Sequence, residues 1–190
     1  LDRVCELRLK LEDLQSIDDK LLKLGIKDSE DFIVINVGGN WDLKRWPDAN
    51  FVQLSQRIIQ ELKVKVVFSG ATSDRVHCEQ IVHAAQVPSV IMAGETTLGE
   101  SLSLYKRAKV VVSADTGPLH LAHSVGADVV GIFGPTRPEI TGPRGVGRSQ
   151  ILFKEINCNK APCYHLACQN NLCMQAVSVK DVFEAVKKLF

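Results

Sequence analysis

Several features that mark common classes of protein are missing from this chain of 190 residues. No apolar run approaches the roughly 20 residues that a membrane-spanning helix needs, so no such span is expected. Residues 1–10 are charged and lack an apolar core, so we expect no secretory signal peptide and a cytoplasmic location. Leu1 is not an initiator methionine, so we expect the chain to be part of a longer protein.

The sequence also lacks an excess of charge of either sign. The net charge is +1, and charged residues make up 24% of the chain. A nucleic-acid-binding face needs a basic excess, and a disordered tail needs a charged run with few apolar residues. We therefore expect no nucleic-acid partner, and the length is sufficient for one domain with a buried core.

Three motifs of nucleotide and acyl chemistry are absent as well. The chain contains no G-x-G-x-x-G, no G-x-x-x-x-G-K-S/T and no G-x-S-x-G. These absences exclude the dinucleotide fingerprint, the P-loop and the nucleophile elbow as the basis of a site. We therefore expect the ligand-binding residues in the loops that follow the predicted strands.

Apolar runs alternate with segments of helical periodicity from residue 26 onward. Runs rich in β-branched residues predict strands, and apolar residues three and four apart predict helices. The expected strands are 32–37, 63–68, 89–92, 110–112 and 129–133, and the expected helices are 48–62, 74–85, 98–107, 119–125 and 179–190. This alternation is typical of a doubly wound parallel sheet, so we predict a Rossmann-like α/β domain over 26–190.

Residues 1–24 read as an amphipathic helix that precedes this domain. Leucine and isoleucine recur at helical spacing with charges between them, and Gly25 ends the pattern. We expect residues 1–25 to be a linker helix whose apolar face packs on the domain or on a partner domain.

The stretch 109–145 contains the strongest candidate site. Its predicted strand, 110–112, is followed by the turn S-A-D-T-G-P, where Thr116 can cap a helix and Gly117 lets a ligand approach the backbone. Asp115 can accept hydrogen bonds from hydroxyls, His120 lies one turn into the helix, and the helix N-terminus favours an anion. The alternative is an ordinary strand-to-helix turn, with Asp115 and Thr116 as caps and His120 in the core.

Polar loops follow three of the predicted strands and should gather along one rim of the sheet. This topology brings together the side chains or backbone of Lys44, Asp74, Asp115, Thr116 and Gly117. The Lys44 ammonium suits a phosphate oxygen, although a lone loop lysine is commonly just solvated. Trp41 and Trp46 flank Lys44. One of them could stack on a base, but we expect them to anchor the loop to the core.

Four motifs occur in a recognisable order: K-R-W-P at 44–47, S-G-A-T-S-D at 69–74, S-A-D-T-G-P-L-H at 113–120 and F-G-P-T-R-P at 133–138. Together they resemble the carboxyl-terminal domain of the heptosyltransferases, the lipopolysaccharide core glycosyltransferases of family 9, which have the GT-B fold. The resemblance covers roughly residues 32–190.

The resemblance implies that the chain binds a nucleotide-sugar donor, typically ADP-heptose. Lys44 would neutralise diphosphate charge, and the backbone at Thr116 and Gly117 would hold phosphate. Asp115 would bind sugar hydroxyls. It also implies inverting transfer of heptose to the lipopolysaccharide inner core, with no cofactor and no catalytic metal.

Two further residues take roles from the same resemblance. Asp74 would contact the nucleoside, and His120 would support the loop. The general base and the lipid acceptor site of the family lie in an amino-terminal domain. We therefore expect this chain to bind donor weakly and to be inactive alone, with the complete enzyme associating peripherally with the inner membrane.

Four cysteines, Cys158, Cys163, Cys168 and Cys173, have the spacing C-x4-C-x4-C-x4-C. This spacing differs from the usual zinc-site pairs. A structural metal, two disulfides and reduced thiols are the three alternatives. Disulfides fit a cytosolic protein least well, and we predict no metal site.

The sequence is also compatible with two other functions. One is a non-catalytic nucleotide-binding module, in which the helix over 1–24 and the cysteine loop serve a partner. The other is a nucleotide-sugar epimerase of related fold. Preference for ADP-linked over UDP-linked ligands, and for sugar-bearing over bare nucleotides, would separate these possibilities.

Overall fold

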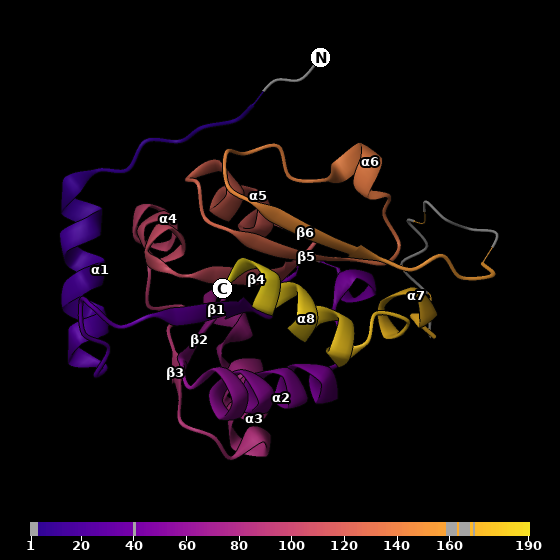
Figure 1. Ribbon diagram of the computed structural model, residues 1–190, viewed down its shortest axis with the longest axis horizontal. Helices are drawn as coiled ribbons and strands as arrows, with labels where there is room; N and C mark the ends of the chain where they lie inside the picture. The colour runs from indigo at the N-terminus through magenta and orange to yellow at the C-terminus, as the bar shows by residue number, and fades with distance from the viewer. Residues whose placement is uncertain (1–3, 40, 159–162, 164–167, 169) are drawn as a thin grey trace.

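The computed structural model describes residues 4–39, 41–158, 163, 168 and 170–190. Within them, six parallel strands form one sheet in the order β3-β2-β1-β4-β5-β6 (Figure 1). The strands are β1 Phe32–Asn36, β2 Lys65–Ser69, β3 Ser89–Ile91, β4 Val110–Ala114, β5 Val129–Phe133 and β6 Ser149–Phe153. The predicted doubly wound parallel sheet is confirmed.

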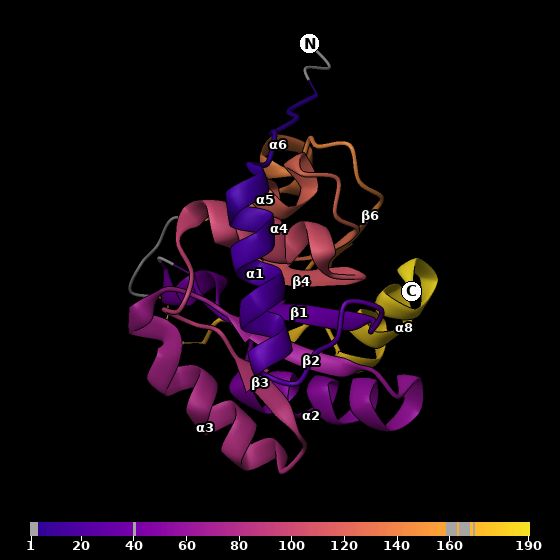
Figure 2. The same cartoon turned by 90° about the vertical axis from the view of Figure 1, so that its left-hand side faces the viewer.

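Helices cover both faces of the sheet. The α-helices are α1 Leu11–Lys23, α2 Asp48–Arg57, α3 Arg75–Ala85, α4 Leu98–Arg107, α5 Gly117–Ser124, α6 Pro138–Thr141, α7 Leu172–Gln175 and α8 Val179–Leu189. Short helical turns are η1 Asp42–Lys44, η2 Ile58–Leu62 and η3 Thr72–Asp74. Helices α2, α3 and α8 pack on one face and α1, α4 and α5 on the other (Figures 1 and 2). In the described part of the chain, no helix has the length and apolar character needed to cross a membrane.

The side chains of β1 alternate between the two faces. Ile33 and Ile35 pack toward α2 and α8, whereas Phe32 and Val34 pack toward α1, α4 and α5. All four are fully buried. Because helices cover both faces, successive side chains of a central parallel strand are all buried, and this is why the sequence shows Phe32–Ile35 as a continuous apolar run.

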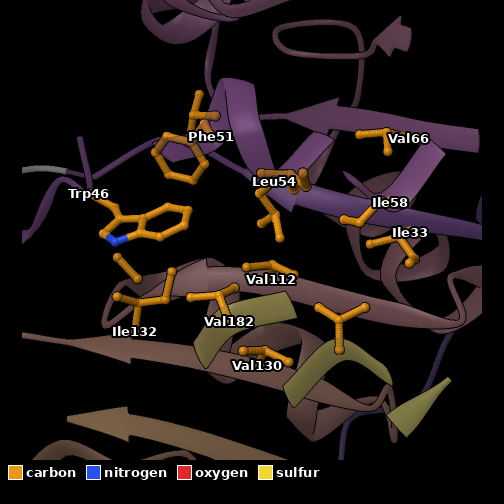
Figure 3. Packing of buried hydrophobic residues seen from close by; sticks show 14 of the residues in the cluster. Ile33, Trp46, Phe51, Leu54, Ile58, Val66, Val112, Val130, Ile132 and Val182 are labelled. Atoms are coloured by element: carbon orange, nitrogen blue, oxygen red, sulfur yellow. The ribbon is translucent and has the colours of Figure 1, made fainter. Parts of the chain in front are cut away.

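Trp46 anchors the loop after β1 in the core. Its buried ring meets Phe51 edge-on, with ring centroids 5.1 Å apart (Figure 3). Its Nε1 donates a hydrogen bond of 2.9 Å to the carbonyl of Val177. The apolar body and the polar edge of the indole are thus both satisfied, and the expected anchoring role is confirmed for Trp46. The anchor fixes the short turn that carries Lys44.

The predicted helix over 1–24 is wrong for residues 4–10. These residues are not helical, and α1 begins at Leu11. The backbone N–H groups of Cys5 and Leu7 donate instead to carbonyls of Arg144 and Ser124. Such bonds to distant segments replace the helical ones, and helical spacing in the sequence gives no sign of them. Residues 1–3 lie outside the described residues.

Strand β6 is not among the predicted strands. It is an edge strand, and its residues are exposed or only half-buried, so its sequence SQILF lacks the continuous apolar run of β1. Its place is fixed by parallel pairing with β5, where Val129 is opposite Ser149. In contrast, the helix at 98–107 and the strand at 129–133 have the predicted bounds.

Glu100 joins α1 to α4 through a nearly buried carboxylate that is only 6% exposed. Its Oε1 accepts from Lys20 at 2.7 Å and from Ser16 at 2.5 Å, and its Oε2 accepts from the N–H of Thr97 at 2.8 Å. The hydrogen bond from Lys20 is the largest cause that lowers the pKa of Glu100 from 4.5 to about 2, followed by those from Ser16 and Thr97. The carboxylate therefore stabilises the packing of α1 on α4.

Glu100→Gln is expected to lower the free energy of unfolding by about 1–3 kcal/mol at pH 7, because a charge-assisted network is lost. Urea denaturation measures the change. The control Glu12→Gln removes a carboxylate that is 76% exposed, and its effect should stay within about 0.5 kcal/mol.

The effect of Glu100→Gln also has a predicted pH dependence. The folded-state pKa of Glu100 is lowered to about 2 from 4.5, so its stabilisation is complete above pH 4.5 and is lost as the pH falls toward 2. The difference in stability between wild type and variant should shrink over this window. A difference that stays constant down to pH 2 would contradict the role assigned to the carboxylate.

Candidate functional site

Loops from three strands meet at one edge of the sheet, as the sequence predicts. Strand β1 lies between β2 and β4, so their carboxyl ends are neighbours at the point where the strand order reverses, the usual ligand position in such sheets. A cavity of about 640 Å³ opens there, within the range of small-molecule sites. Five of the predicted residues line it: Lys44, Asp74, Asp115, Thr116 and Gly117.

Lys44 and Asp115 form an ion pair in the wall of this cavity. The Lys44 ammonium lies 2.7 Å from Asp115 Oδ2 and donates to the Asp115 carbonyl at 2.9 Å. It also lies 5.3 Å from the centre of the Trp41 ring. The lysine side chain is 18% exposed, so the alternative of a merely solvated loop lysine is wrong.

Asp115 is 3% exposed and is surrounded by hydrogen-bond donors. Besides Lys44, Thr136 donates to its Oδ2 at 2.6 Å and Thr141 donates to the same oxygen at 3.1 Å. Burial alone would raise the pKa of Asp115, but hydrogen bonds from His120, Lys44 and Thr136 outweigh it and hold the pKa well below its usual range. Asp115 is therefore a carboxylate at neutral pH.

Thr136 and Thr141 are part of the site, although neither was singled out from the sequence. Thr136 follows β5, and Thr141 ends α6. The F-G-P-T-R-P motif at 133–138 includes Thr136, but nothing in the motif indicates that this threonine contacts Asp115. A threonine that contacts an aspartate 21 residues earlier is recognised only once the strands are placed side by side.

The N-terminus of α5 lines the cavity through Thr116, Gly117 and Pro118. Thr116 occupies the N-cap position with an extended backbone, but its side chain makes no capping hydrogen bond, so the predicted side-chain cap is wrong. Its hydroxyl instead lies 3.2 Å from that of Ser113. A Cβ added to Gly117 would meet nothing within 4 Å, so the backbone there faces open space. The first turn of a helix presents unused N–H groups and the positive end of the dipole, which suit an anion.

Asp74 ends the turn η3 after β2, and its side chain packs against Gly38 and Gly70. Its Oδ2 accepts from the N–H of Ala71 at 2.8 Å. A Cβ at Gly70 would lie 2.8 Å from the Asp74 Cβ, and one at Gly38 would collide with its Oδ2. The two glycines are therefore needed for this carboxylate to reach the cavity wall.

His120 lies beside Asp115 and not in the core. Its side chain is 42% exposed, and Nε2 lies 3.4 Å from Asp115 Oδ1. The alternative of a buried core histidine is therefore wrong. Because this hydrogen bond is long, Oδ1 keeps capacity to accept another donor.

The four cysteines line a second cavity of about 490 Å³, next to the loop after β5. Burial raises the pKa of the Cys173 thiol, and the neighbouring Cys168 and Cys158 raise it further. Among the residues that the structure describes, no group of three or more His, Cys, Asp or Glu side chains is arranged to hold a metal ion. Most of the loop between Cys158 and Asn170 lies outside the described residues, so the three alternatives for the cluster stay predictions.

The chain is similar to proteins whose family is known. Lipopolysaccharide heptosyltransferase 2 of Escherichia coli K12 is 30% identical over 104 residues, which cover 53% of this chain and 30% of the relative. The structure of the glycosyl transferase family 9 protein from Veillonella parvula has a TM-score of 0.84 at 21% identity, covering 97% of this chain and 53% of that one. The structure of E. coli ADP-heptose LPS heptosyltransferase II has a TM-score of 0.78 at 22% identity, with the same coverage.

The two structural matches show the fold, and they show how much of each relative this chain covers. The chain spans about half the length of the two solved relatives. The family model for glycosyltransferase family 9 (heptosyltransferase) matches residues 3–173, well over half of the sequence. With its parallel sheet and the cavity at the reversal of the strand order, this chain belongs to glycosyltransferase family 9, the heptosyltransferase family.

Proposed function

We propose that this chain is the donor-binding half of a heptosyltransferase of lipopolysaccharide inner-core synthesis, and that the cavity beside α5 binds ADP-heptose. The observation that carries the proposal is the Lys44–Asp115 ion pair beside the N-terminus of α5, within a cavity of about 640 Å³. Family membership supports the reaction class, and one solved relative is named as an ADP-heptose enzyme.

The diphosphate is assigned to the end of the cavity that holds the Lys44 ammonium and the start of α5. The Lys44 ammonium lines this end together with Thr116 and Gly117 at the start of α5. A lysine charge and a helix N-terminus both stabilise phosphate oxygens. We expect the lysine to donate to the diphosphate and the backbone N–H groups to bind its other oxygens.

The sugar and the nucleoside are assigned to the two carboxylates. Oδ2 of Asp115 already accepts from three side chains, so Oδ1 is the oxygen that we assign to the sugar hydroxyls. Asp74 also lines the cavity, in the turn after β2, and we assign it to the nucleoside. His120 supports the Asp115 side of the site through its contact with Oδ1.

The reaction that fits these groups is an inverting displacement of the diphosphate. Negative charge develops on the leaving diphosphate, where Lys44 and the α5 N-terminus would stabilise it without a metal ion. We propose that the general base and the lipopolysaccharide acceptor site lie in an amino-terminal half, since the chain spans about half of its solved relatives. The complete enzyme would then act in the cytoplasm, at the inner membrane. Transfer needs both substrates held together, so transferase activity of this chain alone would contradict the proposal.

Calorimetric titration with ADP-heptose, ADP and UDP tests the donor assignment. We expect selective binding of the adenine nucleotides, tighter for the sugar form. Lys44→Gln should weaken ADP binding by about tenfold to a hundredfold, because a charge-assisted hydrogen bond to phosphate is lost. The control Lys23→Gln removes an exposed charge at the end of α1 and should leave the affinity unchanged.

Two outcomes of this titration would contradict the proposal. Equal affinity for UDP and ADP would favour a general nucleotide-binding module or an epimerase. Unchanged ADP affinity in a folded Lys44→Gln variant would remove the lysine from the site.

Gly117→Ala tests the backbone part of the site. The new methyl group meets nothing within 4 Å in the protein, so the free energy of unfolding should not fall. The methyl would instead occupy the approach to the α5 N-terminus, and ADP affinity should drop by about tenfold. Adenosine, which lacks the phosphates, is the ligand control and should bind with unchanged affinity. A stable variant with wild-type ADP affinity would place the phosphates elsewhere.

A further inference from the structure

The hydroxyl of Thr136 is buried against the cavity's central carboxylate. Thr136 is 2% exposed, and its Oγ1 donates to Asp115 Oδ2 at 2.6 Å. Thr141 donates to the same oxygen at 3.1 Å, and Lys44 lies 2.7 Å from it. One carboxylate oxygen thus joins two hydroxyls to the ammonium that faces the cavity.

Thr136 reaches the cavity only through Asp115. The cavity is lined by Lys44 and Asp115, whereas neither threonine is part of its lining. Without the threonines, the carboxylate would keep Lys44 at Oδ2 and the long contact with His120 at Oδ1, and it could turn about its side-chain bonds. Lys44 would then be held mainly by its bond to the Asp115 carbonyl. The two threonine hydroxyls oppose this rotation, because each needs Oδ2 at its present position to keep a hydrogen bond of normal length.

The loop that carries Thr136 also contacts two segments outside the cavity wall. The carbonyl of Pro135 accepts a hydrogen bond of 2.7 Å from the N–H of Cys163. Gly134 lies so close to Met174 that a Cβ at this position would collide with the methionine sulfur. Contacts with Cys163 and Met174 therefore fix the loop that carries the Thr136 hydroxyl.

We propose that Thr136, assisted by Thr141, is a positioning residue for donor binding: it fixes the Asp115 carboxylate and so places the Lys44 ammonium at the diphosphate end of the cavity. The inference rests on the proposed function for its ligand, but the placement of Lys44 is a property of the unliganded chain. A purely structural Thr136 would stabilise the fold without any specific link to Lys44.

A double-mutant cycle separates these two roles. ADP binding is measured by calorimetry for wild type, Thr136→Val, Lys44→Gln and the double variant. Thr136→Val keeps the side-chain shape and should weaken ADP binding by about fivefold to tenfold, while Thr136→Ser, which restores the hydroxyl, should recover affinity to within about twofold. In the Lys44→Gln background, Thr136→Val should change the affinity by less than about twofold, because the residue acts through the lysine.

A second measurement needs no ligand. Acetic anhydride acetylates the neutral lysine amine and releases acetate. The rate at Lys44, followed by mass spectrometry, therefore reports how often the side chain gives up its proton and leaves the ion pair with Asp115. This rate should rise severalfold in Thr136→Val and return toward wild type in Thr136→Ser, while the rate at the exposed Lys23 stays the same in all variants.

The outcomes distinguish the inference from the proposed function. Independent effects of the two substitutions on ADP binding, or an unchanged acetylation rate in Thr136→Val, would overturn the positioning role. If wild type binds no adenine nucleotide, the proposed function fails, and the acetylation rates still decide whether Thr136 positions Lys44.

Discussion

The buried carboxylate of Asp115 is the constraint on which the arrangement of the cavity depends. A charge that is only 3% exposed is costly unless partners surround it. Those partners come from separate segments: Lys44 after β1, Thr136 after β5 and His120 on α5. Satisfying one carboxylate therefore fixes a cation, a loop and a helix at the same edge of the sheet.

The order of the strands makes this convergence possible. Asp115 follows β4, which pairs with β1 on one side and with β5 on the other. The loops of both neighbours therefore end within reach of its side chain. Helix α5 starts at Gly117, so its positive end lies beside the charge of Lys44. A nucleoside diphosphate bound as we propose would meet the Lys44 ammonium and the start of α5, with the carboxylate of Asp74 elsewhere in the cavity wall.

The sequence predicts best those parts whose pattern is set by burial. The helix at 98–107 and the strand at 129–133 have the expected bounds because their apolar periodicity comes from the core they face. Edge strand β6 is half-buried and lacks that pattern, and residues 4–10 are held by bonds to remote carbonyls. The same difference applies to the site. Asp115 was predicted from its position after a strand, whereas Thr136 depends on a contact between loops that no spacing encodes.

The central claim is that the end of the cavity beside Lys44 and the start of α5 holds the diphosphate of a nucleotide sugar. The structure of this chain, determined from crystals soaked in ADP-heptose, would show where the donor binds. We expect diphosphate oxygens within hydrogen-bond distance of the Lys44 ammonium and of the backbone N–H groups at Thr116 and Gly117. A donor bound instead in the cavity beside the cysteines, with Lys44 still paired only to Asp115, would contradict the assignment.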